Sequence, residues 1–224
     1  MIQHVFFDLD HTLWDFERNS EECLKFIYEE HLPTEVLYSD FVNHFRVINK
    51  SLWRDLEFDR ITHDDLRRTR FGKTLQAIEI ECSEEKSLKM NDIFMHHLPN
   101  QKHLMEGAVE TLDYLSQKYS LHIISNGYLE IQTKKMTHSG ILDYFSAIVT
   151  SDVANARKPH REIFDFALEM AQSTRENSIF IGDDDVADKM GAENAEMPFI
   201  YYNINAQTNS NKEISCLSYL KNIL

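Results

Sequence analysis

The 224-residue sequence is poor in cysteine, in basic residues and in long apolar runs. Its three cysteines, Cys23, Cys82 and Cys216, are an odd number, lie far apart and form no C-x-x-C pair, which argues against a disulfide framework and a zinc knuckle. No run approaches the roughly 18 apolar residues of a membrane span, and residues 1–4 do not resemble a secretion signal. We therefore expect reduced cysteines, no membrane partner and a cytoplasmic location.

Positive charge is scarce, since 23 Lys and Arg face 37 Asp and Glu, a formal net charge of −14. This balance argues against a nucleic-acid polymer as partner, because such proteins neutralise phosphates with basic side chains. An anionic substrate would need a metal ion or a local positive charge inside its site. Hydrophobic residues make up 42% of the chain, which is enough for a sizeable core.

Short apolar runs typical of buried parallel strands lie at residues 5–7, 121–124, 147–150, 178–181 and 199–202. After Pro99 these runs alternate with helical segments. Such alternation predicts an α/β fold, a doubly wound parallel sheet of the Rossmann-like type. Residues 205–212 are polar and predict a surface loop.

Residues 19–98 have apolar residues at three- and four-residue spacing, which predicts about eighty residues of helix. Candidate N-caps divide this stretch at Ser39-Asp40, Thr62 and Ser83. We therefore expect a core domain formed by residues 1–14 and 101–224, with a helical domain inserted at residues 15–100.

Polar residues follow three of the predicted strands: Asp8 and Asp10, Ser125 and Asn126, and Asp183 and Asp184. The carboxyl ends of parallel strands are where ligands bind in open sheets. Asp8 and Asp10 would point the same way if the strand stays extended. Paired carboxylates repel unless one is protonated or a cation lies between them, and three of them suit Mg²⁺. Taken alone, a D-x-D pair is more often two strand-end residues that cap the next turn.

The four segments 8–13, 125–127, 158–159 and 182–188 occur in the order of the signatures of the haloacid-dehalogenase (HAD) superfamily, which this sequence resembles. The resemblance implies phosphoryl transfer with Asp8 as nucleophile and Asp10 as acid and base, a role that requires Asp10 to be partly protonated. Mg²⁺ would be held by Asp8, the backbone carbonyl of Asp10 and Asp183.

The same resemblance implies that Ser125, Asn126 and Lys158 bind phosphate. Asp184 and Asp188 would orient Lys158 or metal-bound water, or would stabilise the start of the next helix. Two positions depart from the common pattern: His11 stands where glycine is frequent, and Asp184 where a small hydroxyl residue is frequent.

The insert lies where one HAD class has a helical cap, and such a cap closes over the site. Residues 12–16, 47–53, 61–62 and 68–71 resemble bacterial pyrimidine 5′-nucleotidases that act on noncanonical nucleoside monophosphates. Trp53 or Phe71 would stack a base, Asn49 would bind its edge, and Lys50 or Arg70 would meet phosphate or ribose. The alternative is that Trp53 and Phe71 form the core of the bundle and Arg70 a solvated face.

The sequence thus predicts a Mg²⁺-dependent phosphomonoester hydrolase that acts on a small phosphorylated metabolite, with a pyrimidine nucleoside 5′-monophosphate as the leading substrate. The nearest alternative is a sugar-phosphate phosphatase or a phosphomutase of the same superfamily. A dehalogenase is less favoured because it does not need the acid and base group that Asp10 provides. A non-catalytic scaffold is the alternative of another class, although no signature residue is missing.

Overall fold

A computed structural model describes residues 1–224, and the chain divides into two compact units. The first unit contains Met1–Phe16 and Gln101–Leu224, and the second contains Glu17–Asn100. The second unit is therefore an insertion in the sequence of the first.

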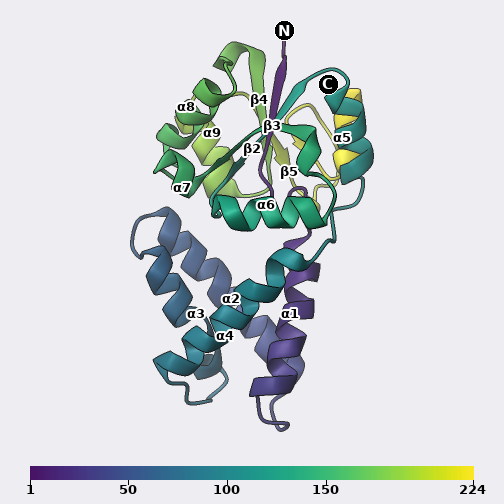
Figure 1. Ribbon diagram of the computed structural model, residues 1–224. Coiled ribbons are helices and arrows are strands. Elements are labelled where there is room, and N and C mark those ends of the chain that lie inside the picture. Colours follow the sequence, from purple (N-terminus) through teal and green to yellow (C-terminus); the bar gives the residue numbers. More distant parts are fainter. The chain divides into compact units, whose positions relative to one another are not determined.

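The first unit is built on a six-stranded parallel sheet with the order β3-β2-β1-β4-β5-β6 (Figure 1). Its strands are β1 (His4–Phe7), β2 (Ser120–Ser125), β3 (Phe145–Thr150), β4 (Ser178–Gly182), β5 (Phe199–Tyr202) and β6 (Glu213–Ile214). The predicted α/β doubly wound sheet is confirmed. Strand β6 was not predicted, because two residues are too few to give a periodic pattern.

Helices cover both faces of this sheet (Figure 1). They are α5 (Ala108–Ser116), α6 (Leu129–His138), α7 (Ser151–Ala154), α8 (Arg161–Met170) and α9 (Gly191–Asn194), with a π-helix at Asp185–Met190. Phe6, Phe164 and Phe180 are fully buried in the core under α8 and α9. On the other face α5 packs beside the C-terminal 3-10 helix Leu217–Asn222.

Strand β1 lies in the middle of the sheet, where the order of the strands reverses. Phe7 pairs with Ile123 of β2 on one side and with Ile181 of β4 on the other. The carboxyl ends of these three strands therefore lie next to one another, at the switch point where open α/β sheets bind ligands.

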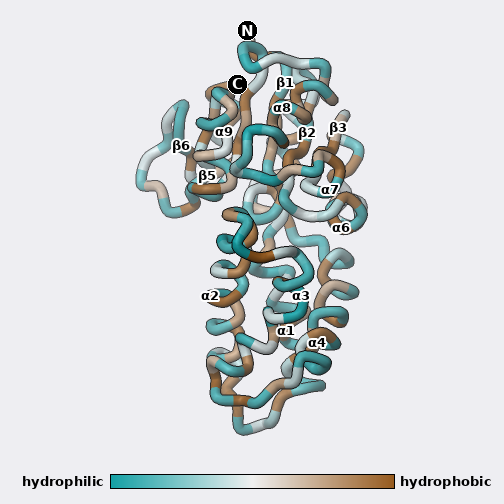
Figure 2. Tube along the Cα trace, turned by 90° about the vertical axis from the view of Figure 1, so that its left-hand side faces the viewer, coloured by the Kyte–Doolittle hydropathy of each residue, from teal (hydrophilic) through white to brown (hydrophobic).

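The second unit contains the four helices α1 (Phe16–His31), α2 (Tyr38–Glu57), α3 (His63–Ala77) and α4 (Glu84–His97), of which α1 begins one residue earlier, in the first unit. Apolar and polar segments alternate along them (Figure 2). The rings of Phe45, Phe71 and Phe94 lie 5.3–5.8 Å apart and are fully buried or nearly so. Phe71 is therefore a core residue of this unit, and Trp53 packs against a second apolar cluster formed by α2 and α3.

Arg70 does not lie on a solvated face, as the alternative reading of the sequence had it. It is 3% exposed and donates hydrogen bonds to the side chains of Asn49 and Asn91. Burial lowers the pKa of this guanidinium to about 9. Arg70 of α3 is therefore a basic residue within the core of the second unit. Periodicity alone does not predict this, because a basic residue in a helix is assigned to the exposed face.

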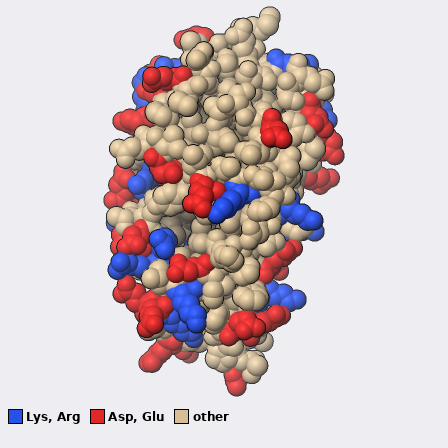
Figure 3. Space-filling view, viewed as in Figure 1, with Lys and Arg blue, Asp and Glu red and all other residues tan.

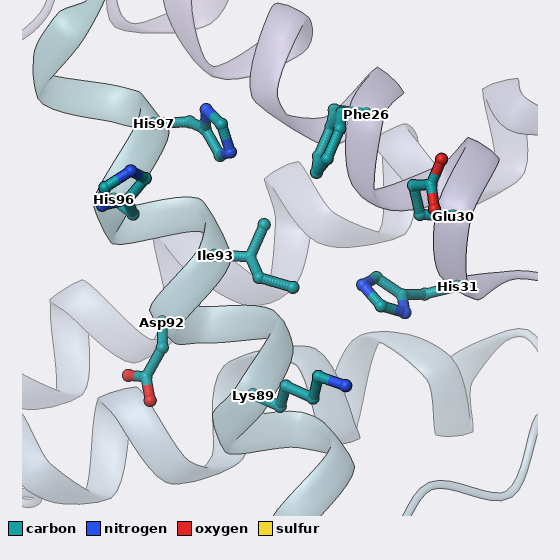
Figure 4. A pocket seen from close by; sticks show the side chains of 8 residues that line it. All are labelled: Phe26, Glu30, His31, Lys89, Asp92, Ile93, His96 and His97. Carbon is teal, nitrogen blue, oxygen red and sulfur yellow. The ribbon is translucent and has the colours of Figure 1, made fainter.

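A hollow of about 400 Å³ lies between α1 and α4 of the second unit (Figure 4). Phe26, Ile93 and His97 line it, and the His97 ring lies 4.9 Å from that of Phe26. Its residues belong to this unit alone and include none of the predicted site residues.

Acidic and basic side chains are interspersed on the face shown in Figure 3, and the basic ones do not form an extended patch there. No helix of the structure combines the length and the apolar character that a membrane span needs.

Two of the three predicted N-caps are present in the second unit. Thr62 forms a capping box with Asp65 at the start of α3, and Ser83 accepts a hydrogen bond from the Lys86 backbone at the start of α4. Ser39 is not a cap, because α2 begins at Tyr38, after Leu37. The predicted cap at Ser39 was therefore wrong.

Replacing Thr62 by Ala should lower the free energy of unfolding by about 1 kcal/mol, because the backbone N–H of Asp65 at the start of α3 loses the side-chain oxygen that accepts its hydrogen bond. The matched control is Ser39→Ala, since Ser39 is exposed inside α2 and caps nothing. Urea denaturation of both variants measures the difference. Equal losses in the two variants would contradict the assignment of the caps.

Candidate active site

Asp8 follows β1 directly and is 7% exposed. The ammonium group of Lys158 lies 2.5 Å from Asp8 Oδ1 and 2.6 Å from Asp188 Oδ1. Lys158 and Asp188 are each 1% exposed, so the three charges form one buried network. The predicted nucleophile and the predicted phosphate-binding lysine are thus brought into direct contact.

The carboxylates of this network hold protons more tightly than carboxylates in water. Burial raises the pKa of Asp8 to about 7, and the neighbouring Asp188 adds to the shift while Lys158 opposes it. Burial also raises the pKa of Asp188. Burial alone would lower the pKa of Lys158, but Asp188 and Asp8 together raise it. Lys158 therefore stays charged at all physiological pH values.

Asp183 extends the acidic cluster from the end of β4. One oxygen atom from each of Asp8, Asp183 and Asp188 can be chosen so that all three lie within 4.8 Å of one another. Burial raises the pKa of Asp183 well above its ordinary value, and the charges of Asp188 and Asp8 raise it further. Thr12 donates a hydrogen bond of 3.0 Å to one of its oxygens.

This donor set fits a hard divalent cation, because carboxylate oxygens with raised pKa values are stabilised when a cation neutralises them. Asp188 is the least available of the three. One of its oxygens faces Lys158, and the other accepts a hydrogen bond of 3.0 Å from the Asp184 backbone. Asp8 and Asp183 are therefore the better side-chain ligands, as the sequence predicts.

Asp10 is held through both of its carboxylate oxygens. Lys135 Nζ lies 2.6 Å from Oδ1, and Gln132 Nε2 donates to Oδ2 at 2.8 Å. Burial alone would raise the pKa of Asp10, but Lys135 and Gln132 more than offset it, so the pKa is lowered. The partly protonated Asp10 expected from the sequence is therefore not the resting form, because two donors stabilise its charge.

Ser125 is the last residue of β2, Asn126 follows it, and the two have different environments. Ser125 is 2% exposed, and its hydroxyl oxygen accepts hydrogen bonds from the Gly127 backbone at 3.2 Å and from Gln132 Nε2 at 2.7 Å. The side chain of Asn126 is bound to the backbone of Lys158 through two hydrogen bonds of 2.7 and 2.9 Å. Asn126 therefore fixes the segment that carries the buried lysine.

Asp184 is the N-cap of the π-helix Asp185–Met190. Its carboxylate accepts hydrogen bonds from the backbones of Val186 and Ala187 at 2.8 and 2.7 Å. Of the roles considered for Asp184, stabilising the start of the next helix is the one that these contacts serve. Asp188 instead contacts Lys158 directly.

His11 has a backbone φ of 67°, in the left-handed region that favours glycine. Its ring packs 5.0 Å from that of Phe16. Glycine would adopt this backbone conformation without strain.

Sequence reasoning did not identify Gln132 and Lys135. Both lie on α6 and are 0% and 4% exposed, so two polar residues occupy its buried face. The available signal was that Gln132 and Lys135 lie about one helical turn apart on the helix that follows the Ser125 segment. Polar residues of this kind in a predicted helix are usually expected to face solvent.

The sequence profile described as haloacid dehalogenase-like hydrolase matches residues 5–202 of this chain. The chain belongs to this family. As a HAD hydrolase it is an enzyme, and the buried acidic cluster described above occupies the carboxyl edge of its sheet.

Relatives of this HAD hydrolase include phosphatases of two kinds. PynA of Streptococcus pneumoniae, a pyrimidine 5′-nucleotidase, is 30% identical over 202 residues, which cover 89% of this chain and 83% of PynA. YjjG of Escherichia coli, also a pyrimidine 5′-nucleotidase, is 29% identical over 200 residues, 89% of this chain and 85% of YjjG. A glyceraldehyde 3-phosphate phosphatase of Methanothermobacter thermautotrophicus is 28% identical over 207 residues, 91% of this chain and 86% of that protein.

Solved structures of this family share the fold. The HAD-hydrolase YfnB of Bacillus subtilis, bound to magnesium, superimposes with a TM-score of 0.91 at 28% identity and covers 100% of this chain and 98% of its own. L-2-haloacid dehalogenase of Xanthobacter autotrophicus superimposes with a TM-score of 0.78 at 17% identity, also over 100% and 98% of the two chains, and shows the fold alone.

The raised pKa of Asp8 predicts a pH dependence of stability. Between the ordinary value of 3.8 and the folded value of about 7, the folded protein keeps a proton that the unfolded chain has lost. The contribution of Asp8 to the free energy of unfolding therefore falls as pH rises through this window. In the presence of a chelator, Asp8→Asn should gain stability relative to the original protein over that window, as measured by urea denaturation. A difference that does not change with pH would refute the shift.

Gly182 predicts a second, steric effect at the site. A Cβ atom at Gly182 would lie 2.4 Å from Oδ2 of Asp188. The carboxylate cannot move away without disturbing the hydrogen bond of Oδ2 with the Asp184 backbone and the contact of Oδ1 with Lys158. We expect Gly182→Ala to lower the free energy of unfolding by about 2 to 3 kcal/mol. In Gly140→Ala, where φ is +73° and nothing lies within 4 Å, the loss should be about 1 kcal/mol at most. Thermal unfolding of both variants tests this, and a smaller loss at Gly182 than at Gly140 would contradict it.

Proposed function

We propose that this HAD hydrolase is a Mg²⁺-dependent phosphomonoesterase that works through an aspartyl-phosphate on Asp8. The observation that carries the proposal is the buried contact of Asp8 with Lys158, because it holds a carboxylate nucleophile beside a fixed positive charge. A carboxylate nucleophile divides one difficult displacement into two easier ones.

Mg²⁺ would be held by Asp8 and Asp183 with the backbone carbonyl of Asp10, and when bound it would neutralise charge on the nucleophile and on the phosphate. The raised pKa values of the two carboxylates support this assignment, since burial disfavours the charge of both, Lys158 offsets this only in part for Asp8, and no basic side chain offsets it for Asp183. Lys158 is the remaining positive charge beside Asp8.

In the first step a carboxylate oxygen of Asp8 attacks phosphorus, and the bond from phosphorus to the ester oxygen breaks. The leaving oxygen takes a proton from Asp10, which becomes protonated when the substrate anion approaches and raises its pKa. In the second step Asp10 removes a proton from water, the water oxygen attacks phosphorus, and phosphate leaves Asp8. The resting contacts of Asp10 with Lys135 and Gln132 suit this second, basic role.

We further propose that the substrates are pyrimidine nucleoside 5′-monophosphates and that residues 15–100 form the cap that selects them. The support is the nucleotidase relatives PynA and YjjG, together with the resemblance of residues 47–53, 61–62 and 68–71 to bacterial pyrimidine 5′-nucleotidases. The relative that is a glyceraldehyde 3-phosphate phosphatase supports a sugar-phosphate substrate as the second candidate. Phe71 is unsuited to stacking a base, because it is fully buried in the helical unit.

The test is phosphate release from a panel of nucleoside monophosphates and sugar phosphates, with Mg²⁺ or with a chelator. We expect Mg²⁺-dependent release that favours pyrimidine monophosphates. Asp8→Asn should abolish turnover, and Asp10→Asn should lower kcat by at least about 10²-fold. Preference for sugar phosphates would keep the mechanism and overturn the substrate class.

Absence of release from every ester would overturn the hydrolase assignment if no phospho-Asp8 can be trapped either. A trapped phospho-Asp8 without release would instead indicate a phosphomutase.

A further inference from the structure

The side-chain amide of Gln132 joins two functional groups of the site. Its Nε2 atom donates to Asp10 Oδ2 at 2.8 Å and to Ser125 Oγ at 2.7 Å, so both amide hydrogens are used. Gln132 is 0% exposed. Its partner Asp10 lies 122 positions away in the sequence, and its partner Ser125 lies 7 positions away. The amide thus connects the segment that follows β1 with the last residue of β2.

The direction of these hydrogen bonds follows from chemistry. An ionised carboxylate can only accept, so the amide must turn its nitrogen and not its oxygen toward Asp10. The same nitrogen then donates to Ser125, whose oxygen also accepts from the Gly127 backbone at 3.2 Å. Both lone pairs of Ser125 Oγ are therefore occupied, and its hydroxyl proton is left to donate.

No residue of the protein accepts that proton, because the hydrogen bonds of Ser125 Oγ are those it receives from Gly127 and Gln132. We propose that Gln132 is a positioning residue that fixes Ser125 as a hydrogen-bond donor to the substrate phosphate and Asp10 as an acceptor. This assignment rests on the proposed phosphatase function.

The other end of the amide supports a functional reason for Gln132. Its Oε1 atom is buried and has no hydrogen-bond partner, which is an unfavourable arrangement for folding. An apolar side chain of similar length would avoid it. The residue is thus poorly suited to stabilising the core and well suited to setting the polarity of its two neighbours.

Lys135 holds the other oxygen of Asp10, which separates the two contributions. Lys135 Nζ contacts Asp10 Oδ1 at 2.6 Å and lies 4.6 Å from the centre of the Trp14 ring. No hydrogen bond connects Lys135 to Ser125. A defect in phosphate binding through Ser125 therefore reports on Gln132 and not on Lys135.

The test is a double-mutant cycle on phosphate binding, which does not require turnover. Orthophosphate is titrated by calorimetry into the Mg²⁺-loaded protein, Gln132→Met, Ser125→Ala and the double variant. We expect Gln132→Met to weaken binding about tenfold when Ser125 is present and by less than about twofold when it is absent. Met has a similar length and removes the unpartnered oxygen, so this variant should fold.

Gln132→Glu gives a second, directional readout. The ionised Glu side chain can only accept, so it would draw the Ser125 proton inward and repel Asp10. We expect phosphate binding to be weaker in Gln132→Glu than in Gln132→Met. A residue that only fills space would give equal effects.

Unchanged binding in Gln132→Met, or the same loss in both Ser125 backgrounds, would overturn the positioning role while the panel of esters still supports the hydrolase. Original protein that neither binds orthophosphate nor releases it from any ester would overturn the proposed function and this role with it.

Discussion

The buried ammonium of Lys158 is the interaction on which the site depends. It separates Asp8 from Asp188, and neither carboxylate could remain charged at this depth without it. Removing the lysine from this network should cost about 3–5 kcal/mol, because two buried carboxylates would lose the positive charge that they share. Other parts of the fold serve this contact: Asn126 binds the backbone of Lys158, and Gly182 leaves the space that Asp188 occupies.

The charges around Lys158 bear on how an acidic protein could bind the phosphate of the proposed substrate. Lys158 and Lys135 each neutralise part of the cluster, but Asp183 has no basic partner among its contacts with Thr12 and the neighbouring carboxylates. The protein as a whole has a net charge of −14, so its general field opposes an anion. In the mechanism that we propose, a divalent cation at Asp8 and Asp183 would remove this conflict locally, and Lys158 would hold the carboxylate of Asp8 in place.

The predictable parts of the fold and site were those encoded in contiguous segments. Five of the six strands followed from short apolar runs, and Asp8 and Asp183 from their position directly after such runs. Parallel strands end at one edge, so order in the sequence translates into proximity in space. Gln132 and Lys135 were not predicted, because a polar residue of a helix is expected to face solvent unless its buried partner is known. Here that partner is Asp10.

The sequence by itself determined the α/β class, the helical insertion and the carboxylate, lysine and serine positions of the site, because each depends on local periodicity or on a short ordered motif. The tertiary structure decided the charge states and the direction of the hydrogen bonds. Whether Asp10 is protonated, or Ser125 donates or accepts, depends on burial and on partners more remote along the chain than the motif itself. The charge states and the hydrogen-bond directions are set only when the strands and helices are packed, since in the unfolded chain solvent would screen every one of these charges.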